Sequence, residues 1–111
     1  MNVTERFLKY VSFHTTSDQA STTTPSTDNQ KVLAAELVKE MKEMGIADAQ
    51  MDQYGYVYGT IEATKGCEDK PYIGLISHMD TSDAISGKDV KARIVKNYDG
   101  KDIVLLSLIH I

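Results

Sequence analysis

The sequence has only one cysteine, Cys67, so it cannot form a disulfide within the chain. A chain without internal disulfides suits a reducing compartment, and we expect a cytoplasmic protein. Basic residues are scattered along the sequence, and the formal net charge is −4 at pH 7. Because nucleic-acid-binding proteins usually carry a basic patch, this charge pattern argues against nucleic acid as a partner.

Long apolar segments are also absent. Three charged residues, Glu5, Arg6 and Lys9, interrupt the N-terminal region before it could form a secretory signal. The apolar run at 103–111 is far shorter than the roughly 20 residues of a membrane-spanning helix, so we expect no membrane partner. The sequence contains no Gly-rich phosphate loop, serine nucleophile elbow, paired-cysteine motif or internal repeat. Its 111 residues suffice for one small domain or for a piece of a larger one.

Two segments have the residue pattern of amphipathic helices. The first begins at Asn2, which has the capping-box spacing with Glu5, and its apolar residues recur every four positions to about residue 12. The second helix is predicted to begin with a capping box at Thr27 and to end at Gly45. Glycine can adopt the left-handed conformation that follows a last helical turn, so we expect a Schellman-type closure there.

The remaining segments change to the period of strands. Strand candidates lie at residues 49–51, 56–61, 72–77, 90–95 and 103–105. The run at 72–77 is uninterrupted and mostly apolar, which is typical of a strand buried on both faces of a sheet. The hairpin dipeptide Asp99-Gly100 would join the last two candidates. The pattern predicts an α/β fold in which two helices pack on a mixed sheet.

His78 and Asp80 follow the predicted strand 72–77 directly. Two residues apart in extended chain, their side chains would point the same way at the carboxyl end of the strand, where open α/β sheets bind ligands. The imidazole can supply a nitrogen to a metal ion, and the carboxylate can fix its tautomer and ring orientation. The alternative is a surface histidine and aspartate in a strand-to-loop turn, and the local pattern leaves both interpretations open.

Several separated motifs occur in an order and spacing that are specific in combination. They lie at residues 5–12, 25–27, 43–45, 76–82, 86–88 and 97–100. Together they resemble the N-terminal part of the peptidase T family, which comprises tripeptide aminopeptidases among the di-zinc metallopeptidases. The resemblance covers residues 1 to about 105.

The resemblance implies an α/β catalytic domain around a mixed sheet, with a small lid domain inserted later. It implies zinc as the cofactor, with two ions in the complete enzyme, and tripeptides as the substrate. His78 matches the family's zinc ligand, and Asp80 matches the catalytic-site aspartate that orients this histidine. The general base and the remaining ligands would lie beyond residue 111, so we expect the chain alone to be inactive. The family also suggests a homodimer.

We expect residues 1–105 to form a partial metallopeptidase catalytic domain. Residues 106–111 depart abruptly from the family and resemble the in-frame translation of a sequencing adaptor, which predicts a non-native tail; a divergent strand end is the alternative. Two other functions stay open. The chain could be a small stand-alone α/β binding or interaction module with a structural His-Asp pair, or part of a related metallo-dipeptidase or deacylase.

Overall fold

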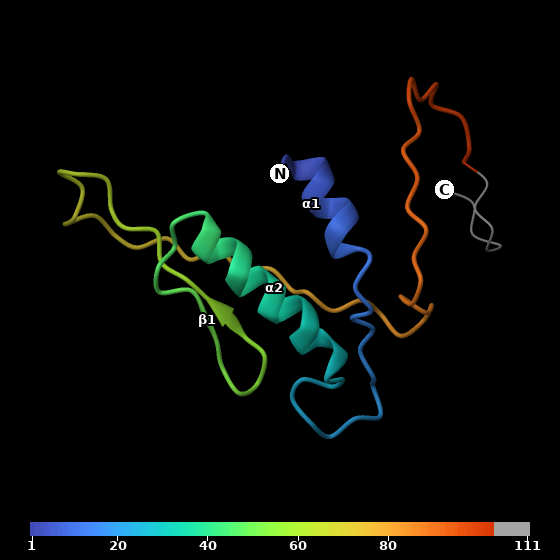
Figure 1. Ribbon diagram of the computed structural model, residues 1–111, viewed down its shortest axis with the longest axis horizontal. Helices are drawn as coiled ribbons and strands as arrows, with labels where there is room; N and C mark the ends of the chain where they lie inside the picture. The colour runs from blue at the N-terminus through green and yellow to red at the C-terminus, as the bar shows by residue number, and fades with distance from the viewer. Residues whose placement is uncertain (104–111) are drawn as a thin grey trace.

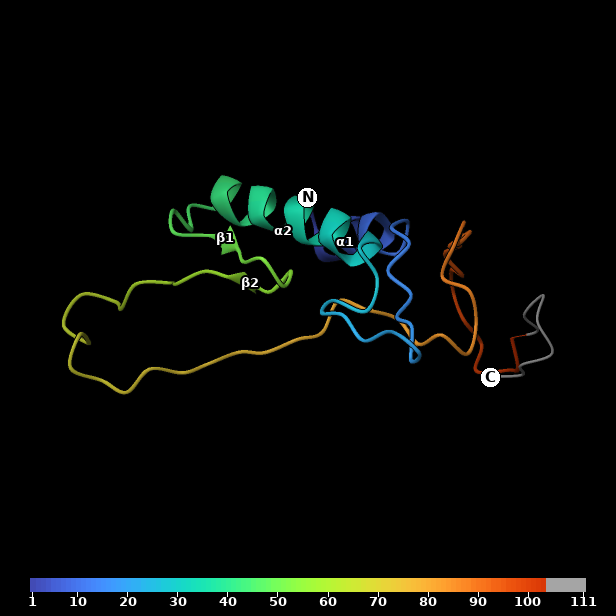
Figure 2. The same cartoon turned by 90° about the horizontal axis from the view of Figure 1, so that it is seen from below.

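The computed structural model describes residues 1–103 and contains two helices and two short strands. In chain order these are α1 (Val3–Tyr10), α2 (Asn29–Glu43), β1 (Gln50–Met51) and β2 (Val57–Tyr58). The strands pair antiparallel, and α2 contacts both of them (Figures 1 and 2). This combination of elements confirms the predicted α/β class. No helix among the described residues has the length and apolar character needed to cross a bilayer.

The start of α1 confirms the predicted capping box. The backbone N–H of Glu5 donates to Asn2 Oδ1 at 2.9 Å, and the backbone N–H of Asn2 donates to Glu5 Oε2 at 2.8 Å. Two of the helix's otherwise unpaired N–H groups are therefore satisfied by local sequence alone.

The capping box predicted at the start of α2 is wrong. The Thr27 hydroxyl donates to the backbone carbonyl of Thr16 at 2.9 Å and does not accept from the Gln30 backbone. Asp28 occupies the N-cap position without a side-chain capping bond. The Thr27 hydroxyl instead accepts from the Gln30 side chain at 3.2 Å, so the spacing of the two residues predicted their contact but not its atoms.

The other end of α2 has the predicted Schellman closure. The backbone N–H of Ile46 donates to Met41 O at 3.0 Å, and that of Gly45 donates to Lys42 O at 3.0 Å. Gly45 has a φ of +95°, which a residue without a Cβ adopts at least cost.

Glu40 joins α1 to α2 through a network of charged and phenolic groups. Its side chain is only 4% exposed and accepts from Lys9 Nζ at 2.6 Å and from the Tyr10 hydroxyl. Lys9 also donates to Glu36 at 2.5 Å, and Arg6 Nε lies 3.7 Å from Glu40. Hydrogen bonds from Lys9 and then Tyr10 hold the pKa of Glu40 below its ordinary value of 4.5.

The strands predicted at 72–77 and 90–95 are absent, which corrects the sequence-based prediction. Ile73, Leu75 and Ile76 are 88%, 93% and 100% exposed, and no backbone–backbone hydrogen bond among the described residues involves the stretch 72–79. A strand buried on both faces needs neighbouring strands to bond its backbone and layers to cover its side chains. The two-stranded sheet of residues 1–103 supplies neither for this segment.

The last predicted hairpin is only partly described. Residues 96–97 form a turn and residue 100 a bend, with positive φ at Asn97 and Gly100, but no strand forms before them. The strand predicted at 103–105 and the tail at 106–111 lie largely or wholly outside the described residues.

The chain is more expanded than a finished domain of its size. Its radius of gyration is 17.6 Å, whereas a compact domain of this length has a radius of about 13 Å. Figure 2 shows why: the segment after β2 swings away from the helices in a long extended loop before returning beneath them. The buried hydrophobic residues found among those described are few, namely Leu33, Ala34 and Ala49.

Candidate functional site

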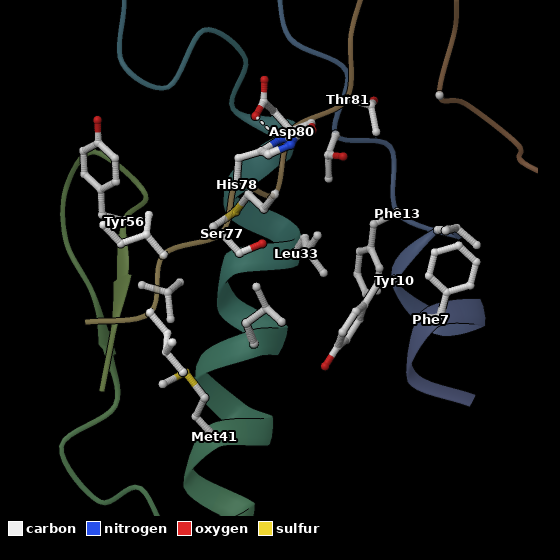
Figure 3. A pocket seen from close by; sticks show the side chains of 18 of the residues that line it. Phe7, Tyr10, Phe13, Leu33, Met41, Tyr56, Ser77, His78, Asp80 and Thr81 are labelled. Carbon is white, nitrogen blue, oxygen red and sulfur yellow. Dashed lines mark hydrogen bonds and ion pairs between the residues drawn. The ribbon is translucent and has the colours of Figure 1, made fainter. Parts of the chain in front are cut away.

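His78 and Asp80 lie where the extended segment returns to the helices. Residues 76–80 run between two hollows, and both side chains line both of them. The larger hollow has a volume of about 790 Å³ and is bounded mainly by apolar and aromatic side chains of α1, α2 and β2 (Figure 3). The smaller, of about 390 Å³, is bounded by residues 24–26 and 54–56 on the other side. The pair therefore sits at an accessible edge with space on either side.

The two side chains are in direct contact, as the spacing predicted. His78 Nδ1 lies 3.1 Å from Asp80 Oδ1 and 3.0 Å from the Asp80 carbonyl oxygen. Both neighbours of Nδ1 are acceptors, so Nδ1 carries the hydrogen of a neutral ring and Nε2 keeps a free lone pair. The His78 side chain is 83% exposed, which leaves Nε2 open to a ligand from outside the chain.

This donor set fits one corner of a metal site. Among residues 1–103, no group of three or more His, Cys, Asp and Glu side chains comes together to hold a metal ion. A zinc site needs three or four protein ligands, whereas this arrangement offers the Nε2 atom of His78 with Asp80 as its orienting partner. His14 belongs to no such group either, and its Nδ1 atom contacts the Asn29 side chain at 3.2 Å.

The position of the pair depends on contacts that the sequence did not reveal. Thr81, directly after Asp80, forms an isolated parallel bridge with Thr16. Its N–H donates to Thr15 O at 3.1 Å, and its carbonyl accepts from Ser17 N at 2.9 Å. In the sequence, the stretch that contains residues 15–17 is dense in Ser and Thr and is typical of a loop. No periodicity or spacing signal linked this stretch to residues some sixty-five positions later.

Comparison with known proteins shows similarity over nearly the whole chain. No protein-family model matches. Peptidase T of Caldanaerobacter subterraneus subsp. tengcongensis is 54% identical over 105 residues, which are 93% of this chain and 25% of that protein. Peptidase T of Clostridium novyi is 52% identical over 103 residues, and that of Geobacillus sp. is 45% identical over 109 residues. The chain spans about a quarter of the length of these curated relatives. With such identity across so much of its length, the chain belongs to the peptidase T family.

Proposed function

We propose that this chain supplies one corner of the metal site in a zinc-dependent aminopeptidase that releases the N-terminal residue of tripeptides. The observation that carries the proposal is the contact of His78 Nδ1 with Asp80, which leaves Nε2 free at an exposed edge. The relatives named peptidase T support the reaction class. The other ligands and the general base belong to the portion of the enzyme that this chain does not span.

In this proposal His78 is the metal ligand and Asp80 is the group that prepares it. Asp80 accepts the Nδ1 hydrogen through both its carboxylate and its carbonyl oxygen, which fixes the tautomer and limits rotation of the ring. Bound zinc would supply Lewis acidity toward the peptide carbonyl and would lower the pKa of a coordinated water. The neighbouring hollows leave room for a small peptide beside the pair.

The wider setting is part of the same proposal. Residues 1–105 would form part of the catalytic domain, and the full-length enzyme would be a cytoplasmic homodimer. Residues 106–111 would be a non-native tail. The stand-alone binding module is not favoured, because the identity to peptidase T extends over 93% of the chain.

A chimera tests the proposal directly. Residues 1–103 would replace the matching segment of the Caldanaerobacter relative, so that the chain acts within a complete protein. We expect hydrolysis of tripeptides that a chelator abolishes and zinc restores. The separate 111-residue chain should show no such activity. A folded chimera without tripeptidase activity, or chelator-sensitive activity in the separate chain, would contradict the proposal.

A further inference from the structure

We infer that Thr16 is a positioning residue for the His78–Asp80 pair, acting through Thr81 and Gly87. The inference rests on the proposed function only in treating His78 as a metal ligand. Its structural part is that the pair is held from its carboxyl-terminal side by a clasp, here defined as residues 15–17 together with Thr81 and Gly87.

The backbone of the clasp fixes Thr81 in two directions. Its N–H donates to Thr15 O, and its carbonyl accepts from both the backbone N–H and the hydroxyl of Ser17, the latter at 3.0 Å. Thr15 is itself only 3% exposed. Since Thr81 follows Asp80 directly, these bonds also restrict the peptide that carries the Asp80 carbonyl oxygen.

The Thr16 side chain lies at the centre of the clasp. Its Oγ1 accepts from the backbone N–H of Gly87 at 3.0 Å and lies 3.4 Å from the Thr81 hydroxyl. Gly87 can approach this closely because it has no Cβ; a Cβ there would lie 2.8 Å from Thr16 Oγ1 and 2.9 Å from Thr81 Oγ1. The Thr16 carbonyl in turn accepts from the Thr27 hydroxyl next to α2, which ties the clasp to the helical part of the molecule.

Nothing comparable supports the pair from its amino-terminal side. The stretch 72–79 has no backbone–backbone hydrogen bond within the described part of the chain, and Ile76 is fully exposed. The position of Asp80 is therefore set by the residues on its carboxyl-terminal side. If the clasp loosens, both acceptors of the His78 Nδ1 hydrogen move, and the ring loses the preference for keeping its hydrogen on Nδ1.

The test reads the tautomer of His78 in the metal-free 111-residue chain. Long-range proton–nitrogen correlation NMR identifies which imidazole nitrogen is protonated, at a pH about two units above the ordinary histidine pKa of ~6.5. We expect the Nδ1–H form to dominate in the unmodified chain. Thr16→Val, which keeps the shape and removes the hydroxyl, should lower the ratio of Nδ1–H to Nε2–H. The upper bound is about tenfold, the worth of the one net hydrogen bond that the Thr16 hydroxyl accepts from Gly87.

Three further variants separate positioning from general stability. Thr16→Ser keeps the hydroxyl and should restore the ratio, whereas Gly87→Ala should lower it by crowding Thr16 Oγ1. Thr64→Val, at an exposed site outside the clasp, should leave it unchanged. Helical circular dichroism is recorded for each variant.

The inference fails if the Nδ1–H form does not dominate in the unmodified chain, or if the ratio of Nδ1–H to Nε2–H is unchanged in folded Thr16→Val and Gly87→Ala. If Thr16→Val loses its helical signal, the tautomer ratio of His78 in Gly87→Ala decides whether the inference holds. Loss of that signal in both variants would also overturn the inference, because the clasp would then stabilise the whole fold and not the pair in particular. No metal or substrate is present, so an inactive chimera would contradict the proposed function without changing this result.

Discussion

Among single residues, Glu40 is the side chain that joins α1 to α2 through hydrogen bonds. It is nearly fully buried, yet it stays charged because Lys9 and Tyr10 donate to it and Arg6 lies nearby. A buried carboxylate without such partners would cost several kcal/mol. A polar network therefore joins the two helices.

The stability contributed by Glu40 should depend on pH. Because the folded-state pKa of Glu40 is lowered by its hydrogen bonds, its contribution is complete above about pH 4.5 and is lost as the pH falls through the lowered pKa. Glu40→Gln should lower the free energy of unfolding at neutral pH by about 1–3 kcal/mol and flatten the acid dependence. Thermal unfolding followed by helical circular dichroism at several pH values checks both effects. The exposed Glu43→Gln is the control, and equal acid sensitivity in the two variants would refute this prediction.

Gly59 is a second residue whose identity is set by packing. A Cβ at this position would lie 2.7 Å from Ile46 Cγ2 and even closer to Met41 Cε, both near the end of α2. Gly59→Ala should therefore destabilise the chain by about 1–3 kcal/mol, measured by urea unfolding. Gly74→Ala, where nothing lies within 4 Å, is the matched control and should have little effect. An unchanged free energy of unfolding in Gly59→Ala would contradict this prediction and would show that the side chains of Met41 and Ile46 can move aside freely.

The contact within the His78–Asp80 pair could be predicted from the sequence, whereas the contacts that hold the neighbouring loops could not. His78 and Asp80 were identified because two residues of extended chain place side chains on one side, and the structure brings them into contact. The contact of Thr16 with Gly87 was missed, because it joins loops far apart in the sequence. Short-range patterns carry no information on such contacts.

At the scale of elements, α1 and α2 followed from local signals and the longer strands did not. A capping box and a Schellman closure are satisfied within a few residues, so each helix can be predicted from its own segment. A buried strand gains its hydrogen bonds from other strands, and the predicted strand 72–77 finds none among residues 1–103. The apolar pattern of residues 72–77 is typical of a strand with neighbours on both sides, and residues 1–103 do not supply those neighbours.

Gly45 ends α2 through its backbone conformation. Gly45 has a φ of +95° and open space around its Cβ position, so its substitution would act only through the backbone. Gly45→Ala should cost about 1 kcal/mol in the free energy of unfolding. Gly45→Asn should cost less, because asparagine tolerates the left-handed region better. Chemical unfolding of the unmodified chain and the two variants measures their free energies of unfolding. An equal decrease in both variants would contradict the backbone explanation.

At the scale of the whole molecule, the chain exposes surface that a finished domain would cover. Tyr72, Ile73 and Leu75 are 88–93% exposed, and a hollow of about 790 Å³ lies open beside the helices. Large exposed apolar surfaces promote association. These features agree with a chain that spans a quarter of its relatives' length.

The separate chain should consequently self-associate. Light scattering should show a mass that rises with protein concentration, and Ile73→Lys should reduce the rise because it places a charge in the exposed segment. Lys70→Arg, which keeps the charge in the neighbouring polar turn, is the control. A strictly monomeric chain at all concentrations would contradict this prediction and would favour a stand-alone module.

The zinc content of the chimera tests most directly whether His78 binds zinc in the complete enzyme, as we propose. The purified chimera should hold about two zinc ions per chain, and His78→Ala should lose about one of them. His14→Ala, a histidine substitution away from the pair, should keep both. A folded His78→Ala chimera with the same zinc content as His14→Ala would contradict the assignment.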